Sequence, residues 1–232
     1  MNIEDIRVRY NVLDVSSIKS FYMIKGGYTG NCKDVYFFRA KGIYTDLLKD
    51  IEDMEKQMRY QINQGLIFYD RINSLERLLK AEEIEYYSNC FSEWKRNNCN
   101  EISIKASINN HLLSKVISVA CKDTLTELRK TDGTLSESIE KNFVIKLLFW
   151  TDKVFEKAEI KWDISKNTKI VAANVDKKHE YLFYYFLTRL GIDVLLIQNN
   201  SDIPDNLRSL SLSKEINIGD FGEIQIKEFD RN

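Results

Sequence analysis

The chain has 232 residues, with 34 Lys and Arg against 35 Asp and Glu, so its formal net charge is −1. A general nucleic-acid-binding protein carries a basic excess, and this balance therefore disfavours that class of partner. With 44% hydrophobic and 30% charged residues, the composition is that of a globular protein and excludes wholesale disorder.

The chain also lacks the sequence signals of membrane and secreted proteins. No apolar run approaches the roughly 20 residues that a bilayer-spanning helix needs, so we expect no membrane association. The N-terminal segment MNIEDIRVRY has no apolar core, unlike a signal peptide. The four cysteines form no C-x-x-C pair and there are two histidines, so we expect reduced thiols and no metal site. These features predict a cytoplasmic protein.

Residues 1–72 are the strand-rich part of the chain. Apolar and polar residues alternate in the first strand, and the turn KGGYTGN separates the next two. A stripe of apolar residues at helical spacing then predicts an amphipathic helix. The expected elements are strands at 6–10, 21–24 and 35–39, a helix at 44–58, and a short buried strand at 66–69.

Residues 73–160 have the apolar spacing that is typical of helices. Asn73 is expected to cap the first helix, with Glu76 as its reciprocal partner in a capping box. Thr134 and Glu137 predict a second capping box ahead of the last helix. The expected helices span 73–94, 101–130 and 134–155. The chain has a single proline, which favours long helices and argues against a flexible interdomain linker.

Residues 161–232 contain the most informative pattern. An apolar run, Ile170–Ala173, is followed by an apolar helix from Lys177 to Leu190 and by a second apolar run, Val194–Ile197. This order predicts a strand–helix–strand unit with parallel strands. Two later alternating segments, 216–218 and 224–226, predict short edge strands. We therefore predict a single α/β domain over residues 1–232, Rossmann-like, with a parallel sheet and a large helical insertion.

The start of the helix at Lys177 is the candidate site. Asp176 is expected to cap it, and Lys177, Lys178 and His179 then occupy its first turn. Cations at a helix N-terminus are locally unfavourable by roughly 0.3–1 kcal/mol each, and a bound phosphate or carboxylate would offset this. Alternatively, the two lysines are solvated and pair with Asp176 and Glu180.

Amides and cations at other strand ends extend the candidate site. Because ligands of open parallel sheets bind beyond the carboxyl ends of the strands, Asn174 and Asn199 are expected to contact a sugar or base, or else to cap their loops. Arg39 and Lys41 end another strand and could reach an anion, although a solvated strand end is the alternative. The sequence shows no nucleophile constellation and implies no particular cofactor.

Three segments of the chain resemble the bacterial YceG-like family, which is described as a component of a "biosynthetic module". They are FFRAKGI at 37–43, NFVIKLLFWTDKVFE at 142–156 and the stretch 168–198, and the similarity is strongest over residues 142–198. The most specific element combines Lys177, His179 and Glu180 with a later Gly-x-Asp-Val. The resemblance implies a cytoplasmic bacterial protein of tellurite-resistance and stress clusters, whose neighbours assemble a nucleoside-like or sugar-like metabolite.

Two functional hypotheses follow. The first is a small-molecule-binding or enzymatic subunit that handles a phosphorylated or nucleotide- or sugar-linked metabolite, with a nucleotide-sugar-dependent transferase as its enzymatic form. The second is a non-catalytic interaction or scaffold module of a multi-protein complex. Protein partners are compatible with both hypotheses.

Overall fold

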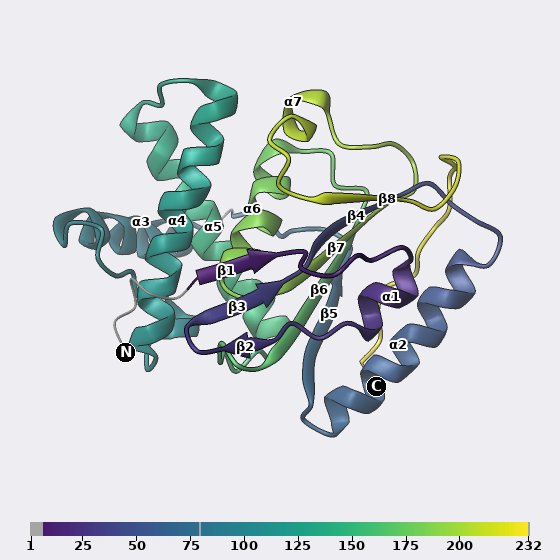
Figure 1. The fold of residues 1–232 in the computed structure, drawn as a ribbon. Helices are drawn as coiled ribbons and strands as arrows, with labels where there is room; N and C mark the ends of the chain where they lie inside the picture. Colours follow the sequence, from purple (N-terminus) through teal and green to yellow (C-terminus); the bar gives the residue numbers. More distant parts are fainter. Residues whose placement is uncertain (1–6, 79, 232) are drawn as a thin grey trace.

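A parallel β-sheet with helices on both faces forms the centre of the computed structural model, which describes residues 7–78 and 80–231 (Figure 1). Its five strands lie in the order β5-β6-β7-β4-β8 and all of their pairings are parallel. The predicted α/β, Rossmann-like fold is confirmed. The strands are β4 (Phe37–Lys41), β5 (Ile67–Ile72), β6 (Asn167–Ala173), β7 (Asp193–Gln198) and β8 (Lys214–Asn217).

The two faces of the sheet are covered by different helices. One face packs against α1 and α2, and the other packs against the helices that follow β5, β6 and β7 (Figure 1). Because both faces are covered, a central strand is apolar and buried along its length, and all of β7 is buried. The helices are α1 (Ile18–Met23), α2 (Leu47–Asn63), α3 (Ala81–Arg96), α4 (His111–Asp132), α5 (Glu137–Lys157), α6 (Lys178–Arg189) and α7 (Asp205–Arg208), and a short 3₁₀ helix, η2 (Lys105–Ser107), precedes α4.

The connection between β5 and β6 is the large helical insertion that the sequence predicts. It contains α3, η2, α4 and α5, and α5 leads back to the start of β6. The start of α3 was predicted at Asn73, which is wrong. The chain continues as β5 to Ile72, which pairs with Ala172 of β6, and α3 begins at Ala81. The Asn73 side chain accepts a hydrogen bond from Arg71 Nη1 instead of capping a helix.

Several other expected boundaries also differ from the structure. Residues 21–24 were expected as a strand but mostly belong to α1, which Ser17 caps by accepting a hydrogen bond from the Ser20 amide. The last insertion helix starts at Glu137, with Ser136 rather than Thr134 as its N-cap. Segment 224–226 was expected as a strand, but it lies outside every strand of the sheets.

A small second sheet lies beside the amino ends of the main strands. Its strands are β1 (Arg7–Tyr10), β2 (Tyr28–Thr29) and β3 (Cys32–Val35), in the order β1-β3-β2. The turn between β2 and β3 contains Gly30, whose φ of 64° favours glycine, so the expected turn lies within KGGYTGN but joins β2 to β3 and not residues 21–24 to 35–39. The expected strand at 6–10 is confirmed from Arg7 onward, and Ile6 lies outside the described residues.

The C-terminal segment crosses the carboxyl ends of the strands and then runs along α2 (Figure 1). The Ile218 amide donates to the Lys41 carbonyl, and the Gly222 amide donates to the Asn199 carbonyl. At the crossing, Gly42 and Gly219 lie in close contact, and a Cβ on Gly42 would lie 1.9 Å from the Gly219 carbonyl oxygen. Farther on, Arg231 donates to the Tyr69 and Ala158 carbonyls. Among the described helices, none has the length and apolar character needed to cross a membrane.

Candidate functional site

The carboxyl ends of β6 and β7 lie next to each other, as the strand–helix–strand prediction requires. The two strands pair in parallel, with Ala173 opposite Ile197, so the loops that follow them meet at the same edge of the sheet. The Asn174 amide nitrogen of the backbone donates to the Ile197 carbonyl across this edge. This edge of the sheet, called the rim below, is where ligands of parallel sheets bind.

Side-chain amides join the two loops at the rim. Asn174 Nδ2 donates to Asn199 Oδ1 at 2.8 Å, and Asn174 Oδ1 accepts from two backbone amides of the β7 loop at 3.1 Å. Gln198 bonds both the N–H and the C=O of Val175. Asn174 has a φ of 50°, in the left-handed region that asparagine tolerates better than most residues. The space between the β6 and β7 loops is therefore occupied by an amide network.

A cavity opens on the other side of β6, between the carboxyl ends of β5 and β6 and the start of α6. We call it the rim cavity, and its volume is about 450 Å³. This volume lies within the range of about 300–1,000 Å³ that is usual for small-molecule sites. It is lined by Asn73, Ser74, Leu75, Arg77, Ala173, Asn174, Val175, Asp176, Lys177, Glu180 and Tyr184.

The start of α6 at this cavity has no side-chain cap. The helix begins at Lys178, and Lys177 occupies the N-cap position without forming a capping hydrogen bond. The predicted cap, Asp176, is wrong because the chain stays extended through Lys177, with φ −90° and ψ 134°, and enters the helix one residue later. A first turn without a side-chain acceptor leaves its backbone N–H groups available to a ligand or water.

The two lysines of this segment have carboxylate partners. Lys177, which lines the cavity, pairs with Glu180 at 2.9 Å, and its side chain is 72% exposed. Lys178 instead pairs with Asp132 at the end of α4, at 2.7 Å. The ion-pairing alternative therefore names the partner of Lys177 correctly, whereas Lys178 pairs with Asp132 and not with Asp176 or Glu180. Lys177 keeps an exposed ammonium at the cavity, where Arg77 of the β5 loop is a second cation.

His179 lies outside the residues that line the rim cavity. Its ring packs on Phe143 with 4.8 Å between centroids, and its Nδ1 lies 3.4 Å from Lys146 Nζ. Burial, together with the charges of Lys146 and Lys178, lowers the pKa of His179 to about 4. The imidazole is therefore neutral near pH 7 and adds no positive charge to the helix start.

Tyr184 is the least expected residue of the rim cavity. The aromatic run of α6 was predicted to be core, and Tyr184 is indeed 2% exposed, yet it also lines this cavity. Its hydroxyl has no hydrogen bond to any residue that the structure describes. Burial raises its pKa, so the hydroxyl stays protonated. The hydroxyl is not among the fully buried side-chain atoms that lack a partner, so it reaches the cavity, where water or a ligand can contact it.

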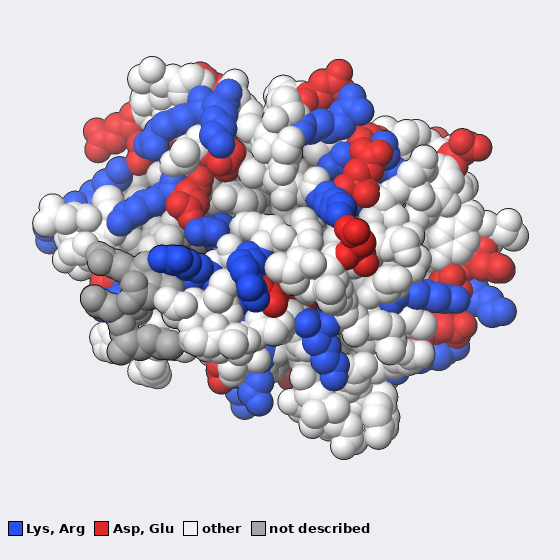
Figure 2. Space-filling view, in the orientation of Figure 1, with Lys and Arg blue, Asp and Glu red and all other residues white. Residues whose placement is uncertain are grey.

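Arg39 and Lys41 form a separate cluster at the end of β4. Arg39 Nε donates to Asp202 at 2.6 Å and its Nη1 donates to Ser213 at 2.8 Å, while Lys41 pairs with Glu215 at 2.6 Å. The Arg39 side chain is buried, and its charge is compensated within this network. Basic and acidic side chains are interspersed in the same manner over the face seen in Figure 2.

Several residues of the rim cavity, namely those of the β5 loop and Tyr184, were not predicted from the sequence. Asn73, Ser74 and Arg77 were read as the start of a helix, although they directly follow a buried strand. Two polar residues after such a strand would have been the available signal. In the part of the chain that the structure describes, no group of three or more His, Cys, Asp or Glu side chains is placed to hold a metal ion.

Comparison with known proteins gives one family. The family model of the YceG domain matches residues 19–229, which is most of the chain. No curated protein and no solved structure matches the chain.

Proposed function

Because this chain belongs to the YceG domain family, we propose that it binds a phosphorylated or nucleotide- or sugar-linked metabolite in the rim cavity. The phosphate would lie at the start of α6 and accept hydrogen bonds from the first-turn amides. Lys177 and Arg77 would supply the positive charge. In the proposed setting, a bacterial stress cluster of the tellurite-resistance type, the protein acts in the cytoplasm.

The observation that carries this proposal is the combination, in one cavity, of an uncapped helix start and the Tyr184 hydroxyl, which makes no hydrogen bond within the described residues. Tyr184 lies in the second turn of α6, deeper than Lys177 along the helix axis. A ligand with an anionic end at the first turn could therefore place a sugar or base beside the Tyr184 hydroxyl.

The arrangement does not by itself imply catalysis. A nucleotide-sugar-dependent transferase is the enzymatic form of this proposal, because such enzymes bind their donors at the same edge of similar sheets. Asp176 and Glu180 line the cavity and are the carboxylates that could contact sugar hydroxyls or accept a proton there. A scaffold without a ligand is the competing function.

Thermal denaturation with a ligand panel tests the proposal. The panel contains inorganic phosphate, ribose 5-phosphate, ADP, UDP and UDP-glucose. A ligand at 100 times its dissociation constant should stabilise the fold by about 2.7 kcal/mol, which is visible as a higher Tm. If none of these compounds shifts the Tm at millimolar concentration, the phosphate proposal is wrong and the scaffold function is favoured.

Charge reversal locates the site. The double variant Lys177→Glu, Arg77→Glu should lose the ligand-induced shift, because both cations line the cavity. Lys122→Glu is the matched control, since Lys122 is exposed on α4 and lies outside the cavity lining. A shift that survives in the double variant would place the ligand elsewhere on the protein.

A further inference from the structure

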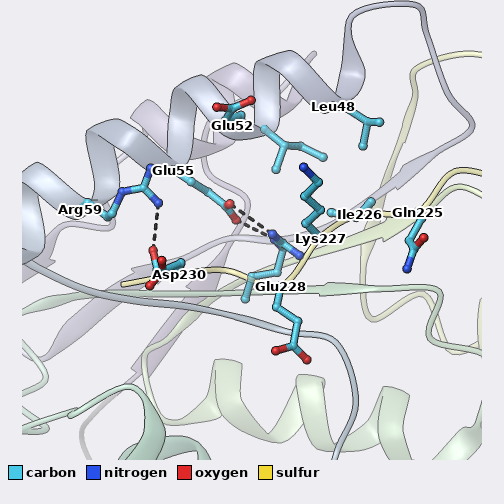
Figure 3. A pocket seen from close by; sticks show the side chains of 11 residues that line it. Leu48, Glu52, Glu55, Arg59, Gln225, Ile226, Lys227, Glu228 and Asp230 are labelled. Carbon is cyan, nitrogen blue, oxygen red and sulfur yellow. Dashed lines mark hydrogen bonds and ion pairs between the residues drawn. The ribbon is translucent and has the colours of Figure 1, made fainter. Parts of the chain in front are cut away.

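A second cavity lies on the opposite face of the sheet, between α2 and residues 225–230 (Figure 3). We call it the α2 cavity, and its volume is about 430 Å³. It shares no lining residue with the rim cavity. Its lining combines apolar and charged side chains: Leu48, Ile51, Glu52, Glu55, Arg59, Arg71, Gln225, Ile226, Lys227, Glu228 and Asp230.

One side of the α2 cavity is formed by a buried ion pair. Arg71 Nε donates to Glu55 Oε1 at 2.6 Å, and Arg71 Nη2 donates to Glu55 Oε2 at 3.2 Å. Glu55 reaches down from α2 toward the sheet, as Figure 3 shows. Arg71 is 2% exposed and Glu55 is 6% exposed. A buried pair of this kind contributes little net stability compared with apolar residues, so its presence at a cavity calls for another role.

The hydrogen bonds of this pair are incomplete. A guanidinium has five N–H donors. Beyond its two bonds to Glu55, Arg71 makes one more, from Nη1 to Asn73 Oδ1 at 3.1 Å. Two N–H groups of Arg71 thus have no acceptor among the residues that the structure describes. Glu55 Oε1 also accepts from the Tyr69 hydroxyl at 2.8 Å, whereas Oε2 accepts from Arg71 alone among the described residues.

The pair therefore has free N–H donors on Arg71 next to Glu55 Oε2, which can accept a further hydrogen bond. The opposite charges of the two side chains cancel. Beyond this pair, the lining carries the cations Arg59 and Lys227 together with the acidic side chains of Glu52, Glu228 and Asp230, so charges of both signs surround the cavity. Because basic and acidic groups are mixed around the pair, the lining favours neither an anion nor a cation over an uncharged group. An uncharged group with a carbonyl beside an N–H would match both halves of the pair. Leu48, Ile51 and Ile226 would contact an apolar body.

We propose that the α2 cavity is a second ligand site, which binds an uncharged molecule through a carboxamide-type edge. The ligand carbonyl accepts from Arg71, its N–H donates to Glu55 Oε2, and its apolar part contacts the aliphatic side chains. Primary amides, lactams and nucleobases carry such an edge. This site does not depend on phosphate binding at the rim cavity.

Three probes of the same shape test this proposal by isothermal titration calorimetry with the full chain. They are 3-phenylpropanamide, 3-phenylpropionate and 3-phenylpropylamine, which differ in the charge of the head group. We expect the amide to bind at least about tenfold more tightly than either charged probe. Equal or tighter binding of a charged probe, or no amide binding at millimolar concentration, would refute the proposal.

Two cavity-filling variants from opposite walls locate the amide. Leu48→Trp on α2 and Ile226→Trp on the C-terminal segment should each weaken amide binding by about tenfold or more. Leu48 is 46% exposed, so this variant should fold even if the other does not. Ile224→Trp is the matched control, because Ile224 is on the same segment outside the lining, and it should leave the affinity within about twofold. Unchanged affinity in folded Leu48→Trp would place the amide elsewhere and overturn the assignment.

Discussion

Two clusters of polar groups, at opposite ends of the parallel strands, differ in how far their members are paired within the protein. At the amino ends, Lys169 pairs with Asp193 at 3.0 Å, and Asp193 also accepts from the Tyr36 amide at 3.0 Å. Nearby, Lys33 donates to the carbonyls of Gly26 and Lys166. At the carboxyl ends of β5 and β6, the Tyr184 hydroxyl and the start of α6 have no side-chain partner and face a cavity.

This difference separates polar groups that stabilise the fold from groups that are available for binding. A buried charge needs a partner within the protein, because leaving it unpaired is costly. A polar group beside a cavity can be satisfied by water or a ligand instead. If this distinction is correct, substitutions at the amino ends should reduce stability strongly, and substitutions at the rim cavity should leave stability nearly unchanged.

The largest expected effect is at Asp193. Asp193→Asn leaves the ammonium of Lys169 buried without a negative partner, and this should reduce the free energy of unfolding by about 3–5 kcal/mol. Urea denaturation measures the loss. The matched control is Asp205→Asn, whose side chain is 89% exposed and whose pair with Arg208 should contribute about 1 kcal/mol or less. A smaller loss for Asp193→Asn than for the control would contradict the comparison.

Two buried tyrosines give the next test. Tyr87 donates to the Asp152 carboxylate at 2.7 Å, so Tyr87→Phe should lower the free energy of unfolding by about 1.5–3 kcal/mol. Tyr184→Phe removes a hydroxyl that makes no hydrogen bond within the described residues, and the change should stay within about 0.5 kcal/mol. Chemical denaturation of both variants measures the difference, and equal losses would show that the Tyr184 hydroxyl is satisfied after all.

A smaller effect is expected at His179, in the way the free energy of unfolding depends on pH. The pKa of His179 falls from its ordinary 6.5 to about 4 on folding, so between these values the unfolded chain binds more protons than the folded protein. The stability that depends on neutral His179 is complete above pH 6.5 and is lost as the pH falls toward 4. His179→Gln should make the pH dependence of the unfolding free energy shallower in this window. Identical slopes for the two proteins would rule out the burial argument.

The smallest effect is expected at Lys177. Its pair with Glu180 is exposed, and its positive charge lies at the positive end of the α6 dipole. Lys177→Gln should therefore change the free energy of unfolding by less than about 0.5 kcal/mol in thermal melts at low and high salt. A loss well above that value would mean that Lys177 stabilises the fold and is not held available for a ligand.

The sequence predicted the fold better than the site. Two continuous apolar runs, with one apolar helix between them, were sufficient to predict the β6–α6–β7 unit. These signals depend only on residues that are close together in the sequence. The rim cavity also needs the β5 loop, about a hundred residues away in the sequence, and the pairing of Ile72 with Ala172 brings it there. Local capping signals at Asn73 and Asp176 were misleading, because Asn73 accepts a hydrogen bond from Arg71 instead and the chain stays extended through Lys177.

The close contact of Gly42 with Gly219 limits what the chain can tolerate where its last segment crosses the rim. Both residues have positive φ, and a Cβ on Gly219 would lie 1.9 Å from the Ile43 carbonyl oxygen, so neither can acquire a side chain without moving the other backbone. A single alanine at either position should displace the crossing, and with it the wall of the α2 cavity. Mutational scans of this protein should therefore find that substitutions at Gly42 and at Gly219 are equally damaging, although both residues lie in loops.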